Sequence, residues 1–165
     1  MICGVLSGGT CSCDLLLKER GFRSGTLPHP LVAGFGAACE IAGQEMERDL
    51  AHVTRLHQKL YDGVVKKIPD VEVNGSLTSR YPGNLNISFA YVEGESLLMA
   101  LRGIAVSTGS ACNSASVEPS YVLKGIGVPR ARALTSLRFS FGRFTTEEDI
   151  DTAIAELRHA VTTLH

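Results

Sequence analysis

Asn84-Leu85-Asn86-Ile87-Ser88-Phe89 decides the fold, because polar and apolar residues alternate along its whole length. A two-residue period is that of a half-buried β-strand. Leu137-Arg138-Phe139-Ser140-Phe141, near the C-terminus, repeats the alternation and predicts a second strand of the same kind. Residues 71–75 are predicted as a short strand with a turn, and Ile104–Ser107 as another short strand. The sequence therefore predicts a small sheet.

Apolar residues with helical spacing surround these strands. Met46, Leu50, Val53, Leu56 and Leu60 recur at intervals of three and four and predict an amphipathic helix over residues 44–67. Further helices are expected over residues 31–43, 96–102 and 120–124, and after a threonine cap at 145–146. We expect Gly103 to cap the third of these helices, and His52 and His57 to lie on a solvated surface. The resulting fold class is α+β, with helices packed on a small mixed or antiparallel sheet.

The charge balance narrows the function classes. The 165 residues include 16 basic and 17 acidic side chains, which excludes the strong positive field of a nucleic-acid-binding protein. No run of eighteen apolar residues occurs, so no membrane span is expected. The first residues have neither the basic start of a signal peptide nor the arginines of a mitochondrial presequence. We expect no nucleic acid, no membrane and no targeting signal.

The cysteines do not form a recognisable framework. Their number is odd, and their spacing fits neither a set of disulfides nor a zinc site: Cys3, Cys11, Cys13, Cys39 and Cys112. The five histidines are scattered. A reducing compartment is the simpler interpretation, and no metal site is expected.

Cys112 stands in a long loop of small and polar residues, 108–119. A thiol that must reach a bound substrate requires an uncrowded, accessible position. Free cysteines are more often buried and inert, so the residue types alone leave both interpretations open.

Residues 107–123, STGSACNSASVEPSYVL, closely resemble the active-site segment of the IscS group of cysteine desulfurases, within the class-V aminotransferase family. The similarity continues through residues 19–26, 84–89, 92–97 and 137–148, and covers residues 19–165 as a whole. Several long motifs in order make a specific signal. The resemblance implies the small C-terminal domain of a pyridoxal-phosphate enzyme of fold type I.

The same resemblance implies an activity. In this family pyridoxal phosphate weakens the C–S bond of L-cysteine, the loop cysteine attacks the sulfur and becomes a persulfide, and L-alanine leaves. The sulfur then passes to an acceptor such as an iron–sulfur scaffold protein. By this match Cys112 is the catalytic nucleophile. A transient iron–sulfur contact through its persulfide stays open. The family forms homodimers and works in mitochondria or in bacterial cytoplasm.

Two further residues match the family pattern. Arg138 corresponds to the arginine that pairs with the substrate carboxylate, a task suited to a planar guanidinium. Thr26 corresponds to a threonine that reaches the cofactor phosphate of the partner subunit. Without the match, Arg138 would be an ordinary strand arginine and Thr26 a turn residue.

The match does not extend far enough toward the N-terminus to include the cofactor lysine. The family places it in a Ser-x-His-Lys motif, and no histidine of this sequence is followed by lysine. Residues 1–18 are predicted to be an irregular segment outside the family, and residues 21–28 a loop, with the family part at 19–165. We expect the chain to be inactive alone. A non-catalytic sulfur-relay or desulfurase-binding module is the alternative.

Overall fold

A computed structural model describes residues 17–18, 23–108 and 118–164. The chain divides into two compact units, Met1–Met46 and Glu47–His165, which are described separately. In the first unit, β1 (Leu17–Lys18) pairs antiparallel with β2 (Arg23–Ser24), where irregular chain and loop had been expected. The expectation was wrong at this point because a two-residue ladder leaves no sequence period.

Helix α1 begins at His29 and runs to Val64, through the boundary between the units. The helical patterns predicted over 31–43 and 44–67 form this one continuous helix, which starts two residues earlier and ends three residues earlier than predicted. Each glycine costs a helix interior about 1 kcal/mol relative to alanine, but does not by itself end a helix. In this helix Gly36 is followed by two alanines and Gly43 by Gln44 and Glu45, which have high helical propensity.

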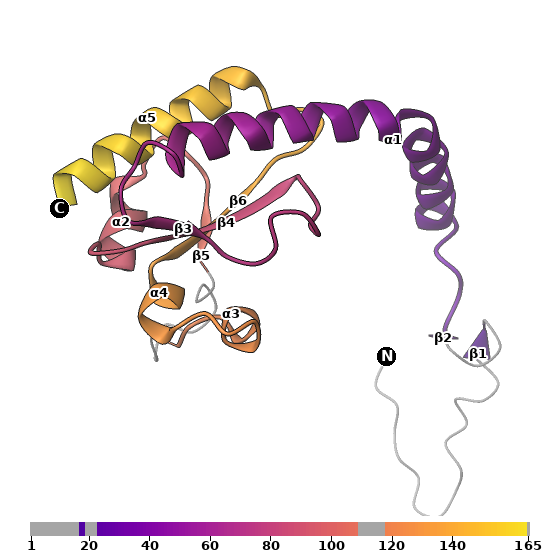
Figure 1. The fold of residues 1–165 in the computed structure, drawn as a ribbon. Coiled ribbons are helices and arrows are strands. Elements are labelled where there is room, and N and C mark those ends of the chain that lie inside the picture. The colour runs from indigo at the N-terminus through magenta and orange to yellow at the C-terminus, as the bar shows by residue number, and fades with distance from the viewer. Residues whose placement is uncertain (1–16, 19–22, 109–117, 165) are drawn as a thin grey trace, which may run out of the picture. The chain divides into compact units, whose positions relative to one another are not determined.

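The second unit contains a four-stranded sheet in the order β3-β4-β6-β5 (Figure 1). These strands are β3 (Val71–Val73), β4 (Asn84–Phe89), β5 (Ser107–Thr108) and β6 (Ser136–Ser140). All three pairings are antiparallel. The α+β class and the strand at 84–89 are confirmed. The strand predicted at 104–107 shares only Ser107 with β5.

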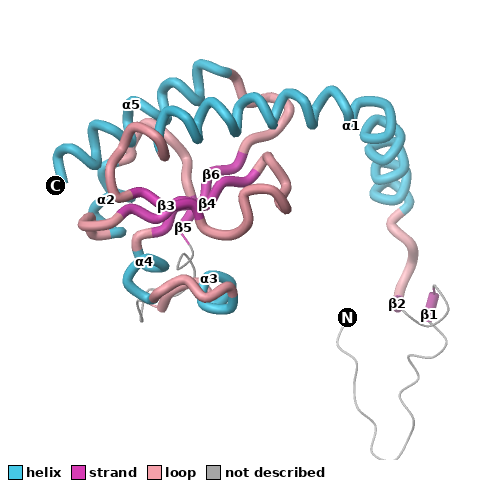
Figure 2. The backbone as a smooth tube through the Cα atoms, in the orientation of Figure 1, coloured by secondary structure: helices cyan, strands magenta, loops and turns pink. Residues whose placement is uncertain are grey.

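One face of the sheet carries the core of this unit. The part of α1 from Glu47 onward and α5 (Glu147–Leu164) lie side by side over it (Figure 2). Leu56 and Leu60 of α1 and Leu157 of α5 are fully buried against the apolar strand residues Leu85 and Ile87. The alternation in β4 and β6 thus points leucine, isoleucine and phenylalanine at the helices.

Three short helices complete the unit: α2 (Gly94–Ala100), α3 (Tyr121–Gly125) and α4 (Arg130–Leu134). Helix α2 had been expected at 96–102. It starts earlier because the Glu93 carboxylate caps it, accepting from the backbone N–H of Glu95 and Ser96. The expected Gly103 cap is also wrong, because α2 ends at Ala100 and Gly103 is not among the glycines with positive φ. Helix α4 had not been predicted.

His52 and His57 of α1 are half-buried and take part in the packing, where a solvated surface had been expected. The His52 ring donates from Nε2 to the carbonyl of Thr145 at 2.9 Å, and His57 donates from Nδ1 to the carbonyl of Pro82 at 2.9 Å. Burial is the main cause that lowers the pKa of His57. Each ring therefore ties α1 to a distant loop, which the charged helix sequence did not indicate.

Candidate functional site

Four polar residues, one for each strand, form a row across the sheet of the second unit. Arg138 of β6 is the register partner of Asn86 in β4 and of Ser107 in β5. Asn74, directly after β3, continues the ladder by donating its backbone N–H to the carbonyl of Asn86 at 2.9 Å. We call Asn74, Asn86, Arg138 and Ser107 the polar row.

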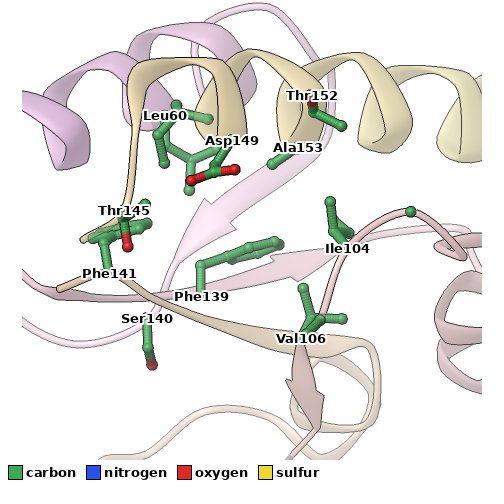
Figure 3. Close-up of a pocket in the computed structure, with 13 residues that line it drawn as sticks. Leu60, Ile104, Val106, Phe139, Ser140, Phe141, Thr145, Asp149, Thr152 and Ala153 are labelled. Carbon is green, nitrogen blue, oxygen red and sulfur yellow. The ribbon is translucent and has the colours of Figure 1, made fainter.

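The polar row lies on the face of the sheet away from α1 and α5. Alternation places Arg138 and Ser140 opposite to Phe139, whose side chain belongs to the buried core. Figure 3 shows the Phe139 ring directed toward α5 and the Ser140 side chain directed the other way. Arg138 is exposed on this face. The predicted substrate-binding arginine is therefore free of the core.

Arg138 is oriented by its neighbour Ser107 in the row. Its Nη2 donates to the Ser107 hydroxyl at 3.1 Å. A guanidinium has five N–H donors in a fixed plane, so this bond leaves most of them for an incoming group. The planar fork matches a carboxylate with two parallel, charge-assisted bonds. The position suits the carboxylate-pairing role expected for Arg138.

Asn74 is also the centre of a buried polar cluster, which lies next to the row on the same face of the sheet. Its side chain is 5% exposed, and Ser88 and Ser136 are buried beside it. The Asn74 amide nitrogen lies 2.8 Å from Ser88 Oγ and 3.1 Å from Ser136 Oγ, and its Oδ1 accepts from Ser88 Oγ at 3.0 Å. Buried polar groups need such partners. The cluster joins the end of β3 to β4 and β6, and so supports the row.

The other predicted site residues fall elsewhere. Cys112 lies outside the described residues, in segment 109–117, which follows directly after β5. Thr26 is exposed in the first unit, next to Gly25 with a φ of +85°. The structure therefore places Arg138 at the base of the Cys112 segment. The roles predicted for Cys112, Arg138 and Thr26 stay predictions.

A cavity of about 290 Å³ opens on the opposite face of the sheet (Figure 3). It is lined chiefly by apolar side chains, among them Leu60, Val106 and Ile150. The Asp149 carboxylate at its rim accepts from the backbone N–H of Thr146 at 2.8 Å as part of the α5 cap. The cavity does not include Arg138, so it is separate from the polar row.

The described lysines do not fit the Schiff-base role that pyridoxal phosphate requires. Lys59 lies 2.8 Å from Asp151, and Lys66 lies 2.6 Å from Asp62. The hydrogen bond to the carboxylate is the main cause that raises the pKa of each amine, so the charged form is favoured. A lysine that forms a Schiff base must instead lose its proton. Lys67 and Lys124 lie after α1 and in α3. No lysine with a described side chain lies on the sheet.

Metal and membrane sites were also sought in the described part. No three acidic, histidine or cysteine side chains gather there closely enough to hold a metal ion. None of the helices there is both long and apolar enough to serve as a membrane span. Cys39, described as a free thiol, is exposed.

Sequence reasoning missed Asn74, Asn86 and Ser107 as members of the site. The alternation in 84–89 does identify Asn86 as a residue of the polar face. It does not say which residue of another strand faces it, because that depends on register.

Comparison with known proteins identifies the family of the chain. The family model described as aminotransferase class-V matches residues 5–153. It begins before residue 19, where the family part was expected to start; that boundary stays a prediction. A mitochondrial cysteine desulfurase of Arabidopsis thaliana is 59% identical over 137 residues, which cover 83% of this chain and 30% of the relative. A cysteine desulfurase IscS of Vibrio vulnificus is 58% identical over 146 residues, which cover 88% of this chain and 36% of the relative.

A solved structure supports the fold. The NifS-like protein from Rickettsia africae superposes with a TM-score of 0.76 at 25% identity, covering 88% of this chain and 38% of that one. The chain thus spans about a third of the length of the relatives it matches. With a family model matching most of its length and close similarity to cysteine desulfurases, the chain belongs to the aminotransferase class-V family.

Proposed function

We propose that this chain forms the part of a cysteine desulfurase that binds the substrate carboxylate and accepts its sulfur. The observation that carries the proposal is the pairing of β5 with β6. It sets Arg138 against Ser107, immediately before the segment that contains Cys112. From Ser107 to Cys112 the chain advances five residues, which span at most about 18 Å when fully extended, so Cys112 is tethered near a substrate held by Arg138.

The proposed reaction balances as a sulfur transfer. L-cysteine and the Cys112 thiol give L-alanine and a Cys112 persulfide. The C–S bond of the substrate breaks, a sulfur–sulfur bond forms, and the substrate carbon gains a proton. Arg138 binds the α-carboxylate and fixes the distance between the substrate sulfur and the loop. Cys112 must attack as a thiolate.

The family depends on pyridoxal phosphate, and the described lysines do not supply its anchor. The chain by itself is therefore proposed not to turn over L-cysteine. Incubation of the isolated chain with pyridoxal phosphate and L-cysteine should release no alanine. Alanine formed in proportion to the chain would show that the argument from the lysines is wrong.

A sulfur-relay role is the second candidate, favoured by an exposed Arg138 in a chain whose described lysines are unsuited to the cofactor. In this role the Cys112 thiolate attacks the outer sulfur of a donor persulfide. The donor sulfur–sulfur bond breaks, a new one forms on Cys112, and the donor leaves as a thiolate. No other oxidant is needed.

Mass spectrometry tests acceptance of sulfur at Cys112. The chain is incubated with a complete cysteine desulfurase and L-cysteine, alkylated and cut with trypsin. Tryptic peptide 103–124 contains Cys112 as its only cysteine, and peptide 24–48 contains Cys39 as its only one. We expect about 32 Da, one sulfur, on the first peptide, also in Cys39→Ser and not in Cys112→Ser. An unchanged first peptide contradicts the proposal.

The finer family properties belong to the same proposal. Thr26 would bind the cofactor phosphate of a partner subunit in a homodimer, and the Cys112 sulfur would pass to an iron–sulfur scaffold protein. Relatives include a mitochondrial protein and a bacterial one, so a mitochondrial or cytoplasmic location is proposed accordingly.

A further inference from the structure

We infer that Asn86 is a second substrate-binding residue, which donates its side-chain amide to the same carboxylate that Arg138 binds. The inference rests on the proposed function, because that function places a carboxylate at Arg138. It adds a neutral hydrogen-bond donor beside the guanidinium, taken from the neighbouring strand. Its basis is the orientation of the Asn86 amide and the register of β4 against β6.

The orientation of Asn86 follows from its neighbour on β3. The Asn74 amide nitrogen donates to Asn86 Oδ1 at 2.6 Å. The oxygen of the Asn86 amide therefore faces β3, and its NH₂ group is on the other side of the amide. Reversing the amide would place two NH₂ groups against each other. Ser88 and Ser136 hold Asn74 itself in place, so this orientation is built into the buried cluster.

The NH₂ group of Asn86 is thereby turned away from β3, and the register partner of Asn86 on its other neighbouring strand, β6, is Arg138. Side chains directly opposite each other on adjacent strands have Cβ atoms about 5 Å apart. Asn86 is partly exposed and Arg138 exposed, so both are reachable from solvent. A carboxylate has about four lone-pair sites and can accept from both donors at once.

The amide is also the right chemical group beside this arginine. An acidic residue at position 86 would pair with Arg138 and compete with the substrate. A neutral amide leaves the guanidinium charge available and adds a donor. Ser107, on the other side, accepts from Arg138 and so orients the fork without neutralising it. The polar row thus presents two donor groups, the Asn86 amide and the Arg138 guanidinium. Asn74 orients the amide, and Ser107 orients the guanidinium.

Nuclear magnetic resonance of the ¹⁵N-labelled full chain tests the inference, with L-alanine as the probe. L-alanine carries the α-carboxylate and has no sulfur to transfer. We expect the Asn86 side-chain NH₂ and the Arg138 Nε–H resonances to shift together, with one dissociation constant. This titration requires no variant, so it does not depend on whether a substituted protein folds.

Asn86→Asp separates binding from support of the fold. The aspartate keeps an oxygen that can accept from Asn74, but it loses the donor and adds a charge next to Arg138. We expect binding of L-alanine to weaken about tenfold or more. The matched control is Asn84→Asp, on the same strand and face but paired with Ser140. It should change the dissociation constant by less than about twofold.

The outcomes separate the two proposals. If Arg138 shifts with L-alanine while the Asn86 NH₂ does not, and Asn86→Asp binds like the native chain, Asn86 is not a ligand and the Arg138 site stands. If neither group responds, the carboxylate site itself is refuted together with Asn86. Sulfur acceptance at Cys112 is then still decided by its own mass measurement.

Discussion

Replacement of Asn74 by alanine tests the buried cluster that supports the polar row. The Asn74 amide nitrogen has two hydrogens and lies within 3.1 Å of Asn86 Oδ1, Ser88 Oγ and Ser136 Oγ. Its oxygen accepts one further bond, from Ser88. Asn74→Ala therefore removes about three hydrogen bonds, each contributing about 1 kcal/mol to stability.

The expected loss in free energy of unfolding is about 3 kcal/mol. Two effects act in opposite directions on this value. Truncation leaves a small cavity, which adds to the loss. The Ser88 and Ser136 hydroxyls lie 3.1 Å apart, and Ser136 also donates to the carbonyl of Arg132 at 2.7 Å, so neither is left without a partner. The estimated loss in free energy of unfolding therefore stays at about 3 kcal/mol, the value of three hydrogen bonds.

Urea denaturation followed by circular dichroism measures this loss. With a slope of about 2 kcal/mol per molar urea, the midpoint should fall by about 1.5 M. Asn84→Ala, at an exposed position of the neighbouring strand β4, is the control and should change stability by less than about 0.5 kcal/mol. A loss below about 1 kcal/mol for Asn74→Ala would refute the reasoning that the cluster supports the sheet.

Three further predictions concern the second unit. Thr146→Ala removes the α5 cap, whose hydroxyl accepts at 3.1 Å, and should cost about 1 kcal/mol by urea denaturation, with Thr146→Ser close to native. The pKa of His57 is lowered on folding, so its contribution to the free energy of unfolding should be fully present above the unfolded value of 6.5 and should be lost as pH decreases through the folded pKa. His57→Asn, whose side chain can still donate to the Pro82 carbonyl, should remove this pH dependence of the unfolding free energy in a pH series. Gly94→Ala would bring a methyl group 2.3 Å from the Leu134 carbonyl oxygen and should lower the melting temperature by several degrees, about 1–3 kcal/mol; an unchanged melting temperature would show that α2 adjusts freely.

Several elements of the fold were predictable because they depend on local pattern. The strand at 84–89 follows from alternation alone, and the strand at 137–141 is displaced by one residue. The apolar face of α5 is also as expected, with Ile150, Ala153 and Leu157 buried. These elements were identified because each is long enough to repeat its hydrophobic period several times, which makes the pattern unambiguous.

Short elements were not predictable in the same way. Helix α4 has five residues, and the pair β1–β2 has two residues in each strand. Such lengths contain less than two periods of any pattern. The start of α2 was displaced because its cap is Glu93, and glutamate is not among the side chains that usually cap a helix. Tertiary contacts decide elements of this size.

For the candidate site, the sequence by itself determined the residue types and the faces. Alternation in β6 puts Arg138 opposite to the core, and the motif around Cys112 names the family chemistry. Only the tertiary structure decided that Asn86 and Ser107 stand on either side of Arg138. The reason is that strand register depends on pairing between segments far apart in the chain, and no local pattern contains that information.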